Sequence, residues 1–431
     1  PVAKTVAAAL NHDGPAQTMT VAGCFSPSVA IAYFDSCADN GLLENIDALT
    51  LHLYGAPQSM PQTLGFFREW LAQHGYGSMP IWVSESGTGW QATPQQRPSL
   101  KESLSVALST TMRGIETMVC GASRYYSFYL GCHTEGSVGW GMCDSQASPL
   151  RSLATWLYAS QALSHKHYLG DLKARPDGLI SARVFGDGGN DAIVVLYSQS
   201  MAPLRLPIRP ECVNGADGRL LNLPADGAIP IPDRMCYVKV SAKSLNGLLE
   251  PGLSDLYKQG QKAVAGKKVR RLVLQPQINA GSVAQTSLNG YTLNPAQASA
   301  FPLTFYASNI SEKPIKGKVR ILALGEGAKA QPKSDEIAID IPPMSSIKES
   351  RSISLQSQLS SSGKVQVKIS AADEDGAVLD TASMIFLPEP AKEVYTVAKG
   401  PDKFSPDGRP SPERWSNAIE ISSLKCYSDA L

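Results

Sequence analysis

A glutamate closes a short apolar run early in the chain. Residues 81–83 are apolar, Ser84 and Glu85 follow, and Gly87 comes shortly after. A short apolar run closed by turn residues is typical of a strand that is buried on both faces. A carboxylate at the end of such a strand is costly to bury unless it has a partner or a chemical role. Glu85 is therefore either a catalytic carboxylate or a structural ion-pair partner.

Two polar side chains lie on the predicted strand that precedes it. His52 and Tyr54 are two residues apart in an apolar segment, which places them on the same face of that strand. Neighbouring parallel strands end at the same edge of a sheet, so both side chains would meet Glu85 there. A carboxylate with His and Tyr donors beside it suits a nucleophile or an electrostatic base. The alternative for His52 is an ordinary core histidine.

Aromatic residues follow the same predicted strand ends. A sugar ring stacks its C–H face on an aromatic ring, and its hydroxyl groups need hydrogen-bond partners. Aromatic faces beside polar groups therefore favour a carbohydrate substrate. The residues predicted to contact it are His52, Tyr54, Trp90, Tyr126, Phe128 and Trp140. Each of the aromatic side chains has the core as its alternative location.

Other chemistries find less support in the sequence. His133 and Glu135 lie near Cys132 and Cys143, but this spacing fits no standard zinc signature, so a metal-dependent hydrolase is the weakest alternative. The segment around Ser84 lacks the two glycines of a nucleophile elbow, which disfavours a serine hydrolase. No glycine motif for a phosphate or a dinucleotide appears. We therefore predict neither a metal nor a cofactor.

The composition narrows the class further. The chain has 431 residues, with 39 Lys and Arg against 38 Asp and Glu, and this balance predicts no nucleic-acid partner. No run approaches the roughly 20 apolar residues of a membrane helix, so no membrane span is predicted. The eight cysteines are an even number. The candidate disulfides are Cys132 with Cys143 and Cys212 with Cys236, and free thiols are the alternative.

The elements that must position these residues alternate in type. Strand and helix patterns alternate over residues 1–168, which predicts a parallel sheet with helices outside it. The predicted strands are 18–23, 47–54, 80–85 and 123–130, and the predicted helices are 26–39, 61–74, 99–118 and 150–163. Ser99 and Glu102 predict a capping box for the third helix. Ser148 and Pro149 predict the N-cap and first position of the fourth.

After about residue 169 the sequence pattern is that of short antiparallel strands separated by turns. Residues 169–243 predict a small β-sandwich and residues 244–268 a linker. Residues 269–390 predict an immunoglobulin-like sandwich whose strands begin with 303–307. Residues 391–431 form a tail.

The chain contains, in order, Asp47, His52 and Tyr54, then Trp82, Glu85 and Gly87, then Tyr125 to Phe128, and the closing run 139–144. This order resembles the last strands of clan-A glycoside hydrolases, which are retaining (β/α)8 barrels. The β-xylosidase and α-L-iduronidase branch is the most similar, and the resemblance covers about the first 240 residues. It implies a multidomain α/β fold in which strands 5–8 of a TIM barrel precede two antiparallel β-sandwich domains. In the tail, 404–421 resembles the start of a further, carbohydrate-binding sandwich.

The resemblance also implies roles. Glu85, at the end of the seventh barrel strand, would be the nucleophile of a double displacement, and His52 and Tyr54 would hold the substrate and the carboxylate. Trp90 and the aromatic eighth strand would wall the subsite at the cleaved bond.

The second carboxylate of such a site has no clear counterpart. The family's acid/base glutamate follows an asparagine at the end of the fourth strand, and no such pair stands in residues 1–168. Glu44, Glu135 and Asp144 are weak substitutes. Half a barrel also leaves two strand edges open. We therefore expect the rest of the barrel to come from the same, longer polypeptide or from a partner chain.

The enzyme has one rival from another class. A non-catalytic carbohydrate-binding or surface protein on a degenerate barrel would also explain a site with one carboxylate. A secreted or periplasmic location is expected from the enzyme class and the even number of cysteines.

Overall fold

The structure is a computed structural model of the 431-residue chain. It describes residues 2–13, 18–28, 31–173, 176–260, 270–287, 290–293, 300–325, 335–354 and 365–387. All of these belong to one unit, residues 1–389. The predicted tail sandwich at 391–431 and part of the predicted linker lie outside the described residues.

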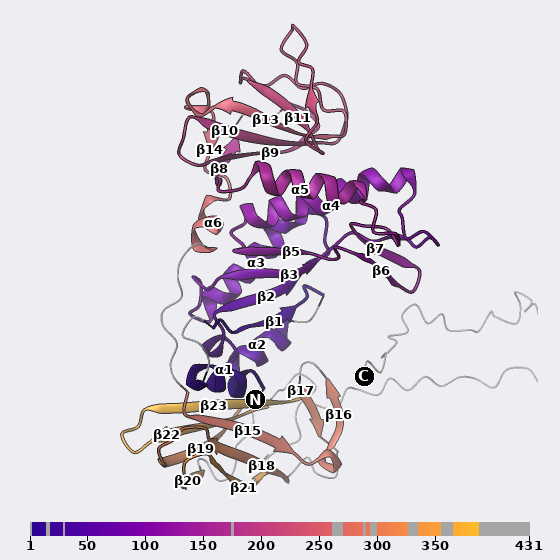
Figure 1. Cartoon of the computed structure of the whole chain (residues 1–431). Coiled ribbons are helices and arrows are strands. Elements are labelled where there is room, and N and C mark those ends of the chain that lie inside the picture. Colours follow the sequence, from indigo (N-terminus) through magenta and orange to yellow (C-terminus); the bar gives the residue numbers. More distant parts are fainter. Residues whose placement is uncertain are drawn as a thin grey trace, which may run out of the picture. The chain divides into compact units, whose positions relative to one another are not determined.

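Four strands near the start of the chain form one parallel sheet, in the order β1, β2, β3, β5 (Figure 1). This confirms the parallel sheet expected from the alternating pattern. The strands are β1 Val21–Phe25, β2 Ala48–His52, β3 Ile81–Ser86 and β5 Arg124–Ser127. The helices are α1 Val2–Asp13, α2 Ile31–Asp39, α3 Met60–Gln73, α4 Leu100–Val119 and α5 Arg151–Ala162, with 3-10 turns η1 Leu43–Asn45 and η2 Pro57–Ser59.

One face of this sheet packs against helices. Leu51 of β2 and Val83 of β3 are fully buried there, in a core that also contains Phe34 of α2 and Phe67 and Trp70 of α3. Burial of each such side chain stabilises the fold by about 1.5–3 kcal/mol. The apolar runs of β2 and β3 are therefore what fixes the sheet on its helices.

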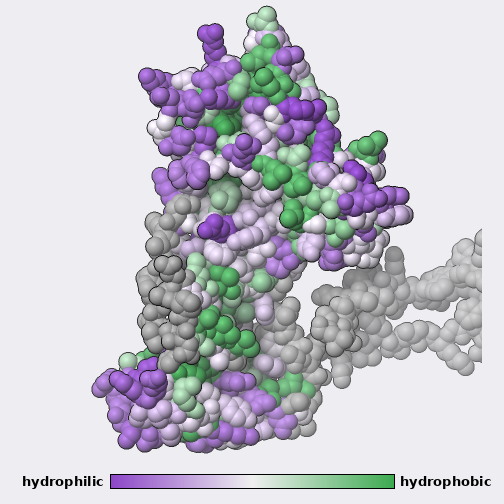
Figure 2. Space-filling view, in the orientation of Figure 1, coloured by the Kyte–Doolittle hydropathy of each residue, from purple (hydrophilic) through white to green (hydrophobic). Residues whose placement is uncertain are grey.

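The opposite face of the sheet is more open. Val21 is 38% exposed and Tyr126 is 49% exposed, and Tyr126 lies against Trp82 with ring centroids 6.3 Å apart. Figure 2 shows hydrophobic side chains at the surface over this part of the chain. Within the described ranges, β1 pairs only with β2 and β5 only with β3. An edge strand has backbone N–H and C=O groups without strand partners, so further strands can add at β1 and at β5.

The capping box at the start of α4 is confirmed. The Ser99 hydroxyl accepts the N–H of Glu102, and the Glu102 carboxylate accepts the N–H of Ser99. The pair satisfies two backbone donors that the first turn of a helix leaves without partners. The sequence signature therefore located the first residue of the helix correctly.

The predicted start of α5 is wrong. The helix begins at Arg151 with Leu150 as its N-cap, and no side chain caps it. The N–H of Ser148 instead donates to Asp144 at 2.8 Å, and Pro149 forms an isolated bridge with the extended segment before it. The loop therefore uses both residues before the helix can start.

Seven strands after α5 form one antiparallel sheet, in the order β12, β11, β13, β10, β9, β8, β14. A sandwich of two sheets was expected over 169–243, and one sheet is found. β14 lies inside the predicted linker and pairs with β8. The elements are β8 His167–Leu172, β9 Leu179–Gly186, β10 Asp191–Ser198, β11 Cys212–Gly215, β12 Leu220–Leu221, β13 Met235–Ser241, η3 Ala242–Leu245, β14 Leu249–Glu250 and α6 Ser254–Gly260.

A buried polar cluster joins α4 to this sheet. Arg183 of β9 donates to the two oxygens of Glu116 on α4, at 3.0 and 3.1 Å, and to Asp171 of β8 at 2.6 Å. The hydroxyl of Tyr168 donates to the other oxygen of Asp171 at 2.7 Å. Removing one partner of a buried ion pair typically costs about 3–5 kcal/mol, so the cluster fixes the position of α4.

The last described elements form two facing sheets, one in the order β15, β18, β21 and the other in the order β16, β17, β23, β22, β19, β20. Leu303 and Phe305 of one sheet and Ile339 and Val367 of the other belong to one buried core. The strands are β15 Leu272–Ile278, β16 Val283–Ser287, β17 Gly290–Leu293, β18 Ala300–Asn309, β19 Ile315–Gly325, β20 Asp335–Ile341, β21 Ser345–Ser354, β22 Val365–Asp373 and β23 Val378–Leu387, with η4 Ala280–Ser282.

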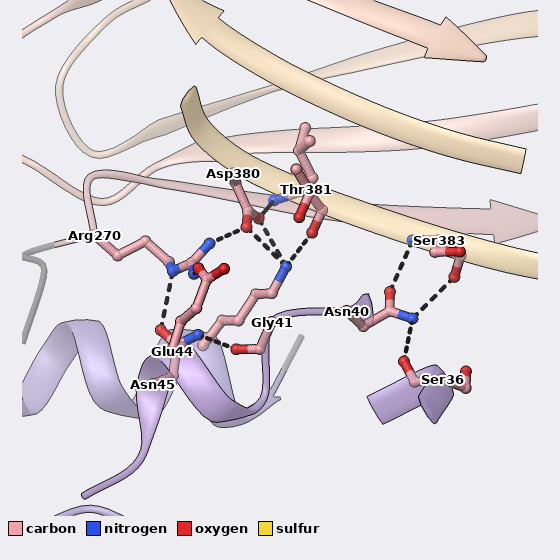
Figure 3. Close-up of polar contacts among 11 residues, drawn as sticks. Ser36, Asn40, Gly41, Glu44, Asn45, Arg270, Asp380, Thr381 and Ser383 are labelled. Atoms are coloured by element: carbon pink, nitrogen blue, oxygen red, sulfur yellow. Dashed lines mark hydrogen bonds and ion pairs between the residues drawn. The ribbon is translucent and has the colours of Figure 1, made fainter. Parts of the chain in front are cut away.

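Polar contacts join this sandwich to the first elements of the chain (Figure 3). Lys4 of α1 donates to Asp380 of β23 at 2.8 Å, and Arg270 donates to the same carboxylate and to Glu44. The side chain of Asn40 accepts the N–H of Ser383 and donates to its carbonyl, both at 3.0 Å. The contacts of Lys4 and Asn40 bring together residues that are 376 and 343 positions apart.

The candidate disulfides are not formed, and Cys132, Cys143, Cys212 and Cys236 are free thiols. In the sheet register, Cys236 lies opposite Gly215, three positions from Cys212. That spacing exceeds the Cα separation that a disulfide spans, and it places the two side chains on opposite faces. The prediction failed because flanking one segment does not make two cysteines register partners.

Candidate active site

Glu85 lies where two strands end side by side. The register pairs His52 of β2 with Glu85 of β3. The Tyr54 hydroxyl donates to Oε1 of Glu85, and Nδ1 of His52 lies 3.6 Å from the same oxygen. The side chains of His52 and Glu85 are 30% and 33% exposed, so solvent and a ligand reach the pair. The convergence expected from the sequence is therefore found.

A break in the strand register orients the carboxylate. Leu51 pairs with Val83, but the next residue of β2 pairs with Glu85, so β3 contains one extra residue at this point. The pairing of β3 with β5 is irregular over the same residues. Such bulges bend a strand and redirect a side chain, and they are common beside active sites. Here the bulge directs Glu85 toward Tyr54.

The environment of Tyr54 keeps it a hydrogen-bond donor. Burial raises the pKa of Tyr54 above its usual value, and the hydrogen bond and negative charge of Glu85 raise it further. The charge of Glu135 acts in the same direction, while that of Arg113 opposes it. Because the phenol stays protonated at neutral pH, Tyr54 orients Glu85 and does not act as a base.

Aromatic rings stand beside this group. Trp140 contacts Tyr54 edge-on, with centroids 5.5 Å apart, and Phe128 contacts Trp140 edge-on at 5.6 Å. Tyr126 lies on the open face of the sheet and not in this ring cluster. Of the predicted aromatic contacts, Tyr54, Phe128 and Trp140 are thus brought together.

Trp90 does not join them. It is only 4% exposed and packs in a small core with Val106 and Leu150. Gly139, its strand partner, lies directly against the indole, where a Cβ would come within 2.6 Å of Nε1. Its ring faces are covered by protein, so Trp90 has no face free to stack on a sugar, contrary to the expectation from the sequence. Sequence alone could not separate a buried indole from an exposed one.

A small hairpin carries the remaining polar groups. The strands β6 Cys132–Glu135 and β7 Val138–Gly141 pair with each other, and β4 Trp90–Gln91 pairs with β7. Nε2 of His133 lies 3.3 Å from Oε1 of Glu135. The described residues contain no group of three or more His, Cys, Asp and Glu side chains that could hold a metal ion.

The three weak substitutes for a second carboxylate, Glu44, Asp144 and Glu135, have different surroundings in the structure. Glu44 binds Arg270 beside the C-terminal sandwich, and Asp144 binds Arg97 at 2.8 Å. Glu135 pairs with His133, whose ring lies edge-on to Phe128 with centroids 5.8 Å apart. Of the three, Glu135 is therefore the one that lies beside the aromatic rings of the site.

Close packing beneath Trp140 explains a glycine that follows Glu85. A Cβ on Gly87 would lie 2.4 Å from the Phe128 carbonyl oxygen, and a Cβ on Gly89 would lie 2.5 Å from Val138. Any side chain at Gly87 would displace backbone, which is why glycine is needed there.

Arg113, which also contacts this loop, was not predicted from the sequence, because an arginine in a helical pattern usually indicates a solvent-facing position.

None of the helices in the described part of the chain is long and apolar enough to cross a membrane. No protein-family model matches the sequence, and neither does any curated protein.

Several solved structures are similar over part of the chain. A GH39 β-xylosidase from Caulobacter crescentus has a TM-score of 0.38 at 13% identity, covering 56% of this chain and 60% of that one. A glucosidase from Croceicoccus marinus has 0.33 at 11%, covering 82% and 64%. A family 51 α-L-arabinofuranosidase from Bifidobacterium longum has 0.28 at 13%, covering 56% and 59%. This chain therefore spans under two thirds of each relative, and likeness at such scores assigns no function.

Proposed function

We propose that this chain carries the nucleophile of a retaining glycoside hydrolase. The observation that supports this is the convergence of Tyr54 and His52 on one oxygen of Glu85, at the carboxyl ends of adjacent parallel strands. Active sites of parallel β/α folds lie at that edge. A carboxylate that is held by two side chains and still reached by solvent is suited to attack a bound substrate.

The proposed reaction begins with Glu85. One carboxylate oxygen attacks the anomeric carbon, and the bond from that carbon to the leaving oxygen breaks while an acid protonates the leaving oxygen. Water then attacks the anomeric carbon, the bond from that carbon to Glu85 breaks and frees the carboxylate, and the conjugate base of the same acid takes the proton of the water. Tyr54 and His52 both contact Oε1, so within the described contacts Oε2 is the oxygen left for the attack.

The surroundings of Glu85 suit a sugar. Tyr54, Phe128 and Trp140 present aromatic rings, and the half-exposed pair His133 and Glu135 offers donors and acceptors for hydroxyl groups. Binding sites of this kind combine apolar faces with a few fixed polar groups. We propose a poly- or oligosaccharide as the substrate.

The acid/base carboxylate is proposed to come from outside this chain's described residues. The two carboxylates of a retaining site stand about 5–5.5 Å apart, and Glu135 is already paired with His133. The open edges of the four-stranded sheet give further strands a place to add. We propose that strands completing the barrel, from the same polypeptide or a partner, bring the second carboxylate to Glu85.

Covalent trapping tests the nucleophile directly. Activated fluoroglycosides with a dinitrophenolate leaving group need no acid to start the reaction, so the chain alone can be treated with a panel of pentosyl and hexosyl donors. Intact-mass spectrometry should show one added glycosyl group, and peptide mapping should place it on Glu85. Glu85→Gln should abolish the label, while Glu135→Gln should leave it in place. A label that persists in the Glu85→Gln variant would disprove the nucleophile.

Among the described residues, only Glu85 is a carboxylate whose contacts support a catalytic role. This favours a second candidate, a non-catalytic carbohydrate-binding protein. The same experiment separates the two. Sugar binding without any covalent adduct, from every donor in the panel, would favour the binding protein.

A further inference from the structure

A buried arginine lies behind the two loops that carry the site. Arg113 is on α4 and is only 3% exposed. Its Nε donates to the carbonyl of Gly55 at 2.7 Å, and its Nη1 donates to the carbonyl of Gly87 at 2.7 Å. The hydroxyls of Thr88 and Ser109 accept its other bonds, both at 3.2 Å.

The two carbonyls are not equivalent backbone positions. Gly55 directly follows Tyr54, and Gly87 lies two residues after Glu85. A guanidinium is a rigid planar fork, so binding both carbonyls fixes the distance between the two loops. We propose that Arg113 is a positioning residue, which holds Tyr54 at hydrogen-bond distance from Glu85. This inference rests on the proposed function for its catalytic meaning.

Electrostatic interactions link Arg113 to the site in addition to its hydrogen bonds. The hydrogen-bond acceptors of Arg113 are carbonyls and hydroxyls, and the described contacts include no carboxylate partner. Burial lowers the pKa of Arg113, which shows the cost of keeping the cation there, while the phenols of Tyr125 and Tyr54 oppose the shift. The cation in turn acts on Tyr54. Its charge and its geometry are therefore both directed at the site.

The chain offers a matched control. Arg68 of α3 is 2% exposed and also joins two backbone carbonyls, those of Met79 and Gly121. These carbonyls precede β3 and β5, at the opposite end of the strands from Glu85. Arg68 and Arg113 are thus alike in burial and in joining two backbone carbonyls, and of the two only Arg113 lies at the site.

The experiment compares Arg113→Lys with Arg68→Lys in the full chain. Lysine keeps the charge but lacks the rigid planar fork that fits both carbonyls, so both variants should unfold at lower temperature. Tyr54 ionisation is followed by ultraviolet titration of each protein against its Tyr54→Phe counterpart. In Arg113→Lys the weakened bond to Glu85 should lower the pKa of Tyr54 toward its usual value, whereas in Arg68→Lys it should not change. The rate of Glu85 labelling should fall about 10- to 100-fold in Arg113→Lys alone.

The Tyr54 titration tests the positioning role of Arg113, and the labelling of the wild-type protein tests the proposed function. An unchanged Tyr54 titration in folded Arg113→Lys, or an equal change in Arg68→Lys, would overturn the positioning role. If Arg113→Lys does not fold, Thr88→Val, which removes one acceptor and keeps the guanidinium, should shift the titration in the same direction, and no shift would overturn it. The titration needs no catalysis, so failure of wild-type labelling would count against the proposed function and not against Arg113.

Discussion

Lys4 and Asp380, which are 376 positions apart, form an ion pair of 2.8 Å at the interface of α1 with the C-terminal sandwich. Lys4 is 3% exposed and the Asp380 side chain is completely buried. The carboxylate also accepts from Arg270 and from the N–H of Leu274. Asp380 thus lies between two cations that are shielded from water, and of these Arg270 also pairs with Glu44.

We predict that Asp380→Asn strongly destabilises the protein. The change leaves Lys4 and Arg270 buried without a carboxylate between them, and removing one partner of a buried pair typically costs about 3–5 kcal/mol. Denaturant unfolding measures the loss. The control is Asp340→Asn, because the pair of Asp340 with Lys316 is well exposed and should be worth less than about 1 kcal/mol. Equal effects of the two substitutions would contradict the prediction.

Tyr54→Phe should slow glycosylation of Glu85. A hydrogen bond to a charged group is worth about 1.5–3 kcal/mol, so its loss should lower the labelling rate about 10- to 100-fold. The rate is measured by intact mass at saturating fluoroglycoside. Tyr129→Phe is the control, since Tyr129 is 46% exposed and has no described bond to Glu85. A Tyr54→Phe variant that labels at the wild-type rate would remove Tyr54 from the mechanism.

The loop before α5 should respond to acid through Asp144. Burial raises the pKa of Asp144, but the N–H groups of Ser148 and Gln146 and the guanidinium of Arg97 outweigh it and hold the pKa below its usual value. A lowered carboxyl pKa stabilises the fold above the unfolded pKa of about 4 and loses that effect as the pH falls further. Asp144→Asn should therefore lower the melting temperature at pH 7, and the difference should shrink below about pH 4. A difference that does not depend on pH would contradict this assignment.

The cysteines should differ sharply in reactivity. Burial raises the pKa of Cys236 to about 12, and burial with the charge of Glu116 raises that of Cys120 to about 12. Exposed Cys24 and Cys132 should react with iodoacetamide at pH 8, while Cys120 and Cys236 should react only after unfolding. Peptide mapping of the alkylated protein gives the pattern. Recovery of a peptide that links Cys132 to Cys143 would show that the free thiols are wrong.

Local signals located much of the fold. The apolar run before Glu85 became β3, and the capping box at Ser99 marked the start of α4. Both signals depend on residues that are close in sequence. The apolar run of β3 reflects burial, and the capping box of α4 reflects the N–H groups that the first turn of a helix leaves without partners. The strand β15 was not predicted. It contains Pro276, which has no N–H to donate to a neighbouring strand, and a proline argues against a strand in a sequence pattern. The strand β15 is an edge strand, where the sheet tolerates that loss.

The site depended on features that are not local. The types and spacing of His52, Tyr54 and Glu85 indicated that they meet, but the bulge that orients Glu85 belongs to the pairing of two strands. The burial of Trp90 and the bonds of Arg113 likewise depend on segments distant in sequence. Side-chain type therefore predicted which groups take part, and tertiary packing decided which of them face a ligand.

The two open edges of the four-stranded sheet have a consequence for mass action. A segment that binds the folded sheet and not the unfolded chain raises its stability in proportion to RT ln(1 + [L]/Kd). Strands supplied by a separate polypeptide would make the melting temperature rise with total protein concentration. Strands supplied by the same polypeptide would act at a fixed effective concentration, and the melting temperature would not change on dilution.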